Sequence, residues 1–246
     1  MMTLIRRIVV FGVLAFIAVA LLIGNGYVSN PIGLWEISKH RPRAEAQLAR
    51  LENVARAAAT AKLPSEPWNA SSIASRTGVM PSDDTVLAVH LEHLLDLGTR
   101  PSMGRVWFCE ALPVSQAAAF VRTGRWPGGE PLSLLDMGEV VRDKFEALDR
   151  VRHVIVIRPV SYSPPEDKGI RFVTGYYTGE ALAFDAANAR VLGGFTFDAR
   201  NSSSVEGRGS LQSILVRNLS KNASAAFHDQ LKTRVPALTP EGLGCS

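Results

Sequence analysis

The sequence lacks the short motifs that identify common catalytic and nucleotide-binding sites. No serine stands in a Gly-x-Ser-x-Gly elbow, and the glycine-rich stretch at residues 124–129 is not followed by the lysine of a phosphate-binding loop. No internal repeat occurs at the periods of solenoids or propellers. These patterns identify no reaction, so the sequence alone predicts no catalytic residue and no cofactor.

Cysteine is scarce, since Cys109 and Cys245 are the only two in 246 residues. A disulfide between them would close a loop of about 136 residues and stabilise the fold by about 4 to 5 kcal/mol in a chain-entropy description. Such a bond requires an oxidising compartment. The alternative is that Cys109 is a small buried hydrophobic residue. A nucleophilic Cys109 is disfavoured because the local sequence offers no base to activate it.

Excess charge is small and confined to one end of the chain. The formal net charge is +4, but residues 1–62 hold eight Lys/Arg against three Glu, while the remainder holds nineteen basic against twenty acidic residues. Lys39, Arg41 and Arg43 are placed to meet anionic lipid headgroups or to solvate a neck. No basic face interleaved with aromatic residues occurs elsewhere, so nucleic acid is not an expected partner.

Charge is absent altogether from Ile8 to Val28, a run of twenty-one residues. As a helix this run would be roughly 31 Å long, enough to cross the hydrocarbon core of a bilayer. Arg6 and Arg7 precede the run and Tyr27 lies near its far end, as expected at membrane interfaces. The sequence therefore predicts a signal-anchor helix and a single-pass membrane protein, with the lipid bilayer as a partner through residues 8–28.

A cleaved signal peptide is the competing interpretation of this run. Ala18-Val19-Ala20 fits a small-x-small cleavage site, but Leu21 to Ile23 continue the apolar run beyond it. Basic residues also follow the run, but large domains translocate largely regardless of their charge. We expect a cytoplasmic N-terminus and an extracytoplasmic domain, which is periplasmic if the source is a Gram-negative bacterium.

The remaining sequence predicts one α+β domain. We expect a membrane anchor at residues 1–30, a basic neck and helix at 31–62, and the domain at 63–246. Residues 29–33 predict a turn-rich joint, followed by a segment that ends at Pro42, and residues 64–84 predict a loop. Apolar residues at helical spacing predict helices at 43–62, from 83 or 84 to 97, from 113 or 115 to 121, at 133–149 and at 211–235.

An antiparallel β-meander is the clearest expected element, at about residues 151–200. Its strands are expected at 154–157, 170–177, 180–185 and 190–198, joined by short turns and covered by helices on one apolar face. A further strand is expected at 105–111, and a strand over 85–91 is the alternative to the helix there. The expected fold class is thus α+β, with an antiparallel sheet packed by helices.

Two weak candidate sites remain. On a helix, His90 and His93 would share a face and could reach one metal ion, with Glu92 beside them and Asp96 or His153 as a third ligand. The ordinary interpretation is that the two histidines lie on the solvent side of that helix. A second candidate is Tyr176 with Tyr177, which could line a ligand groove or could simply pack across strands.

Three classes of function follow from these patterns. The favoured hypothesis is a membrane-anchored envelope protein whose domain binds an unknown protein partner or forms a structural part of an assembly. The second is a metal-dependent enzyme that uses His90, Glu92 and His93. The third is a small-ligand sensor or carrier that uses the sheet near Tyr176 and Tyr177.

Overall fold

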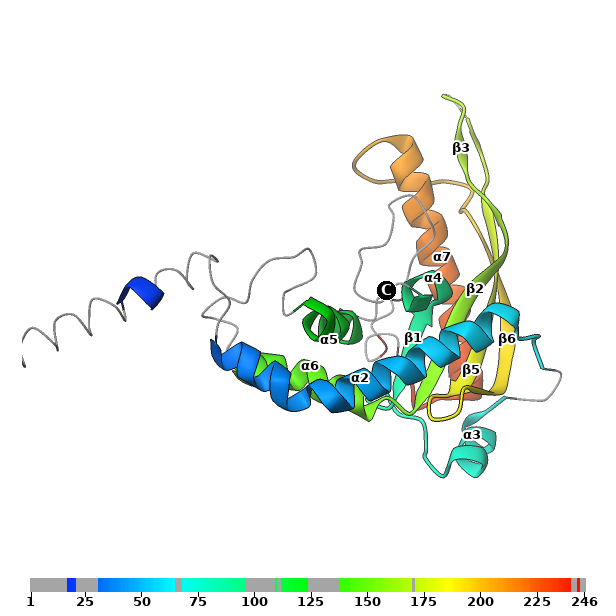
Figure 1. Cartoon of the computed structure of the whole chain (residues 1–246). Coiled ribbons are helices and arrows are strands. Elements are labelled where there is room, and N and C mark those ends of the chain that lie inside the picture. Colours follow the sequence, from blue (N-terminus) through cyan, green and yellow to red (C-terminus); the bar gives the residue numbers. More distant parts are fainter. Residues whose placement is uncertain are drawn as a thin grey trace, which may run out of the picture. The chain divides into compact units, whose positions relative to one another are not determined.

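The chain is described here by a computed structural model (Figure 1). The described residues are 17–20, 31–64, 68–95, 109, 112–123, 138–169, 171–239 and 243. They divide into two compact units that each combine distant parts of the sequence. Of the described residues, the first unit holds 17–20, 31–46, 113–123 and 138–149, and the second holds the others.

The first unit is built from helices. It contains the beginning of α2 (Pro31–Thr60), nearly all of α5 (Leu112–Thr123) and most of α6 (Gly138–Arg150). The His40 ring stacks on Phe145 with ring centroids 5.5 Å apart, which joins α2 to α6. The helices predicted near residues 113–121 and 133–149 are therefore present, although residues 133–137 lie outside the described part.

Helix α2 corrects the expected joint and the expected end at Pro42. It begins at Pro31 and continues through Pro42, although an internal proline removes a backbone hydrogen bond and costs about 3 kcal/mol. Ile37 and Ala44 on either side of the proline are each 1% exposed. Burial of this face offsets the cost, and local propensity could not indicate that packing.

The second unit is organised around a four-stranded mixed sheet in the order β1-β2-β5-β6. Strand β1 is parallel to β2, whereas β2–β5 and β5–β6 are antiparallel. The sheet strands are β1 (Val86–His90), β2 (His153–Ser163), β5 (Tyr176–Asp185) and β6 (Arg190–Arg200). The short pair β3 (Glu166–Asp167) and β4 (Phe172–Val173) lies in the connection from β2 to β5.

The predicted break between strands at residues 177–180 is wrong, because β5 runs straight through Gly179. A Cβ atom at this glycine would lie 2.5 Å from the Phe197 ring of the neighbouring strand. The glycine therefore permits a close cross-strand approach and does not form a turn. The turn predicted at residues 185–189 is present and joins β5 to β6.

The helix predicted from residue 83 or 84 to 97 is also wrong. Val86–His90 forms β1, and only Leu91–Leu95 forms a helix, α4. All five residues of β1 are buried, as expected for a strand whose two faces are both covered. A short apolar run of this kind fits a helical or a strand period equally well, and only its pairing with β2 decides between them.

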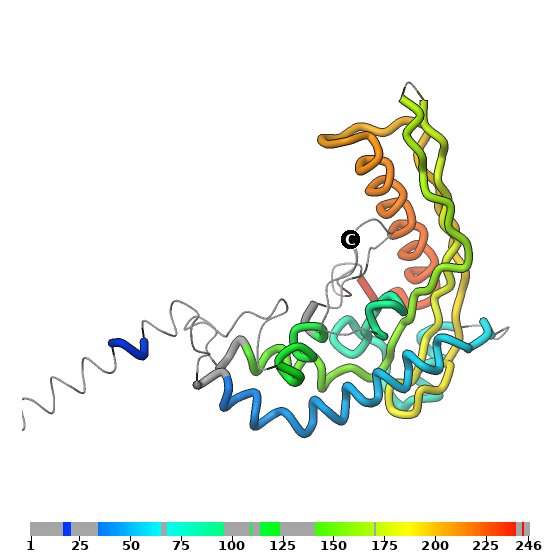
Figure 2. Tube along the Cα trace, turned by 45° about the horizontal axis from the view of Figure 1, so that its top comes forward, coloured from blue at the N-terminus to red at the C-terminus, as the bar shows by residue number. Residues whose placement is uncertain are grey.

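Helices cover both faces of the sheet within this unit (Figures 1 and 2). Helix α7 (Leu211–Arg234) packs on one face, where Phe227 contacts the rings of Phe195 and Phe197. The later half of α2 crosses the other face, and the Arg158 guanidinium of β2 donates to the carbonyls of Ala58 and Ala61 at 2.6 Å each. The predicted α+β class and the C-terminal helix are thus confirmed, but the meander is covered on two faces.

A short helix, α3 (Ala70–Thr77), lies within the predicted loop 64–84. Asn69 caps it, since its side chain accepts from the Ser72 backbone N–H while the Ser72 hydroxyl accepts from the Asn69 backbone N–H. Gly78 ends the helix with φ of 72°. The Asn-x-x-Ser spacing is a recognisable capping signal that the Pro- and Ser-rich composition concealed.

Among the described residues, no helix is both long and apolar enough to cross a membrane. The predicted anchor at 8–28 lies outside the described residues except for 17–20, which are helical. The predicted strand at 105–111 is described only at Cys109, which forms an isolated β-bridge. The boundaries predicted after residues 30 and 62 remain predictions.

Candidate functional site

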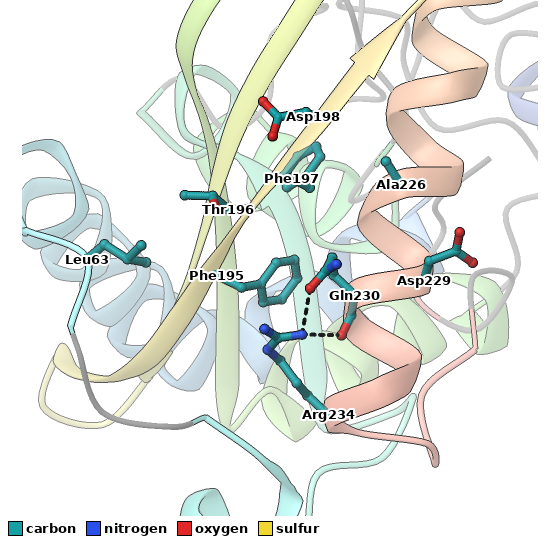
Figure 3. Close-up of a pocket in the computed structure, with 9 residues that line it drawn as sticks. All are labelled: Leu63, Phe195, Thr196, Phe197, Asp198, Ala226, Asp229, Gln230 and Arg234. Atoms are coloured by element: carbon teal, nitrogen blue, oxygen red, sulfur yellow. Dashed lines mark hydrogen bonds between the residues drawn. The ribbon is translucent and has the colours of Figure 1, made fainter.

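A groove of about 680 Å³ lies beside the edge of the sheet (Figure 3). We call it the β6–α7 groove, because most of its lining comes from these two elements. Its lining residues are Leu63, Phe195, Thr196, Phe197, Asp198, Ala226, Asp229, Gln230 and Arg234. All of them belong to the second unit.

The alternation of β6 divides the lining into two sides. Successive side chains of a strand point to opposite faces, so Phe195 and Phe197 turn toward α7 and are each 3% exposed. Thr196 points the other way in Figure 3, and Thr196 and Asp198 are both exposed. The groove thus has an aromatic side against α7 and a polar side on the opposite face of β6.

The aromatic side of the groove packs against α7. The Phe227 ring lies 5.8 Å from that of Phe195 and 5.7 Å from that of Phe197. Phe227 itself is fully buried on the face of α7 that carries Leu219, Ala223 and Leu231. Ala226 and Gln230 lie beside this buried stripe and are partly exposed, so α7 forms a wall of the groove as well as part of the core.

Arg234 is fixed at one end of the groove. Its guanidinium carbon lies 5.0 Å from the centre of the Phe195 ring, a cation–π contact. Its Nη1 donates to the Gln230 carbonyl at 3.0 Å and to the Gln230 side-chain oxygen at 2.7 Å. Asp229, the residue before Gln230, is exposed.

Asp198 supplies the negative charge of the opposite side. Its carboxylate accepts a 2.6 Å hydrogen bond from the Thr178 hydroxyl on the neighbouring strand β5. Among the described strands β6 is the outermost, so none of them lies on the other side of Asp198. The Asp198 carboxylate therefore has a hydrogen-bonding neighbour on β5 and lies next to the outer edge of β6.

The secondary structure around the two predicted histidine ligands differs from the one expected. His90 is the last residue of β1 and not part of a helix, so it does not share a solvent-facing helix face with His93. The two rings meet edge to face with centroids 6.4 Å apart, and His90 is 4% exposed. In the part of the chain that the structure describes, no group of three histidine, cysteine or acidic side chains is arranged to hold a metal ion.

Burial determines the ionisation of His90. Loss of solvation, with a smaller contribution from neighbouring His93, lowers the pKa of His90 to about 3. Burial likewise lowers the pKa of His153, although Asp185 opposes the shift. His153 contacts the Thr77 hydroxyl through Nε2 at 3.0 Å and is not brought into a ligand set with His90.

The two predicted tyrosines point to opposite faces of β5. Tyr176 is 43% exposed and its hydroxyl lies 3.4 Å from that of Ser161, whereas Tyr177 is 3% exposed and packs near Phe197. Burial, with a smaller contribution from the charge of Glu92, raises the pKa of Tyr177. The two rings therefore lie on opposite faces of β5, and a ligand role for either tyrosine stays a prediction.

Cys109 is fully buried and disulfide-bonded. Cys245, the other cysteine of the chain, lies outside the described residues. The pairing of these two residues stays a prediction, and the buried bonded sulfur leaves no role for Cys109 as a free nucleophile.

The β6–α7 groove was not predicted from the sequence. The sequence does show apolar and polar residues in alternation from Phe195 to Asp198. This alternation identifies only a strand with one apolar face. The sequence could not show that this strand ends the sheet, or that Arg234 lies above Phe195. These facts depend on strand order and on where α7 docks.

Comparisons with known proteins identify no family. No protein-family model matches the chain, and no curated protein matches it. Among solved structures, lipoprotein GNA1162 from Neisseria meningitidis is similar at 13% sequence identity and a TM-score of 0.24, over 62% of this chain and 99% of that one. We base no conclusion on a likeness with so low a TM-score.

Proposed function

We propose that this chain is a membrane-tethered protein of the cell envelope whose α+β domain binds another protein at the β6–α7 groove. The observation that carries the proposal is the groove itself, which lies beside the outermost strand of the sheet. Recognition sites commonly combine a concave aromatic surface with a few fixed polar groups. Phe195, Phe197 and Asp198 supply that combination here.

Two features of the chain support the placement in the envelope. The uncharged run from Ile8 to Val28, preceded by Arg6 and Arg7, has the length and flanks of a signal anchor. The disulfide at Cys109 is of a kind that persists in oxidising compartments and is rare in the cytosol. Together they favour an anchored domain on the extracytoplasmic side.

Site-specific photo-crosslinking tests the binding role. A photoreactive amino acid placed at Thr196 of the full-length chain is expected to capture another protein in native membranes. Ala187, exposed in the turn between β5 and β6, is the matched control position and is expected to capture none. Equal capture at both positions, or none at Thr196, would contradict the proposed site.

A fusion experiment tests the placement separately. Alkaline phosphatase joined after residue 40 is active only when it is exported, so we expect high activity in intact cells. Low activity would put the domain on the cytoplasmic side. That result would overturn the placement without bearing on the groove.

A small apolar ligand is the second candidate for the groove. Its volume of about 680 Å³ lies in the range of roughly 300–1,000 Å³ usual for ligand sites. Phe195 and Phe197 would supply the apolar contacts. We favour a protein partner because the groove runs along the edge of a strand and is open, whereas a small-ligand site is usually a more enclosed cavity.

A further inference from the structure

The backbone of β6 has an open stretch beside the groove. The Asn201 N–H donates to the Gly175 carbonyl at the start of β5, so Asn201 points inward, whereas the Arg200 carbonyl accepts from the Asn222 side chain and points outward. Backbone groups of alternate residues in a strand point the same way. The N–H and C=O groups of Thr196 and Asp198 therefore point outward with those of Arg200.

Both ends of this edge are closed by other parts of the unit. Near the start of β6, the Leu192 carbonyl accepts from Arg76 of α3, and Trp68 packs against Gly193. At the far end, Asn222 covers Arg200. Among the described residues, none donates to or accepts from the outward backbone groups of Thr196 and Asp198. An exposed edge of this kind is a template for pairing with another strand.

We propose that an extended segment of a partner protein, with alternating apolar and basic residues, pairs with the open edge of β6 as a fifth strand of the sheet. This inference rests on the proposed function and specifies the chemistry of its partner. Main-chain hydrogen bonds to Thr196 and Asp198 would give affinity, and side-chain pockets would give specificity, as in other cases of strand addition.

The two sides of the groove select different side chains. On the α7 side, an added strand places alternate residues beside Phe195, Phe197 and Ala226, which supply the apolar part of the lining. On the opposite side, its residues lie next to Asp198, which bonds Thr178 on β5 and has no basic residue among the lining of that side. A lysine or arginine beside Asp198 would complete a cross-strand charge pair.

Selection from a random nonapeptide library on the full-length protein in lipid nanodiscs tests the inference. We expect the enriched peptides to alternate apolar and basic residues. Methylation of their backbone nitrogens on the paired side should weaken binding at least about tenfold, because it removes the hydrogen bonds of strand addition. Binding that is indifferent to N-methylation, or enrichment without alternation, would overturn the proposal.

Two variants and a control identify the edge as the site. D198K is expected to weaken binding of the basic peptide about tenfold and to restore it for a peptide with glutamate in place of lysine. T196P removes the outward N–H of Thr196, which makes no hydrogen bond to β5, and should also weaken binding. D143K, the same charge change at an exposed position of α6, should leave binding unchanged. Circular dichroism confirms that each variant is folded.

Other occupants give distinct results. Thr196 crosslinks between two copies of this chain would overturn the proposal in favour of self-association. Binding of small apolar probes to the groove, without binding of any peptide, would overturn it in favour of a ligand site. If Thr196 still captures a different protein while N-methylation has no effect, strand addition fails and the proposed function stands. If Thr196 captures nothing, both fail.

Discussion

Acid should destabilise this fold through His90, and replacement of His90 should remove that part of the effect. The buried ring has a folded-state pKa of about 3, against the ordinary value of 6.5 for histidine. As the pH falls below 6.5, His90 therefore becomes protonated in the unfolded chain but stays neutral in the folded chain. Stability from the neutral ring is fully present above that pH and is lost progressively down to about 3.

The size of the effect follows from this difference in pKa. Linkage gives a loss of about 2 kcal/mol at pH 5 and about 3 kcal/mol at pH 4 relative to neutral pH. Because the His90 side chain is buried, solvent screening does not reduce this figure appreciably. A loss of this size is a large fraction of the stability of an ordinary domain, about 5–15 kcal/mol.

Urea unfolding of the full-length chain in detergent, followed by tryptophan fluorescence, measures the effect across the pH range from about 7 to 4. His90→Gln does not titrate there, so the difference in free energy of unfolding between variant and wild type should shift by about 2 kcal/mol between neutral pH and pH 5. A constant difference for His90→Gln across the range would refute the reasoning.

Two further outcomes are expected. Arg158→Leu should destabilise the protein by about 3 to 5 kcal/mol in urea unfolding, because it leaves partly buried Glu180 unpaired and removes the donors to the carbonyls of Ala58 and Ala61. Glu180→Gln keeps a hydrogen-bonding side chain and should cost less. Equal costs for the two variants would contradict this role of the guanidinium. Cys245→Ser should lower the free energy of unfolding by about 4 to 5 kcal/mol and abolish any further effect of reductant; an unchanged response to reductant would contradict the Cys109–Cys245 pairing.

The elements that the sequence predicts well are those whose information is local. Leu215, Leu219, Phe227 and Leu231 recur at helical spacing, and α7 lies where that spacing places it. The turn between β5 and β6 likewise follows from its short sequence at residues 185–189, where the Asp185 and Asn188 side chains hydrogen-bond within the turn. In both cases neighbouring residues alone decide the conformation.

The errors occur where distant contacts decide. Val86–His90 is a strand because β2 pairs with it, and Pro42 stays helical because Ile37 and Ala44 are buried on either side. Gly179 resembles a turn residue until Phe197 is placed beside it. The groove depends on strand order and on helix docking, and neither leaves a periodic signal in the sequence.

The parallel pairing of β1 with β2 has a consequence for how the chain folds. Strands β2, β5 and β6 follow one another closely and can associate through short turns, but β1 pairs with a strand that begins only at His153. Closing so long a loop costs more chain entropy than closing a hairpin. The order of assembly should therefore be the meander first and β1 last, so that the β1-facing edge of β2 is transiently exposed while the new chain folds and depends on fast docking of β1 to avoid aggregation.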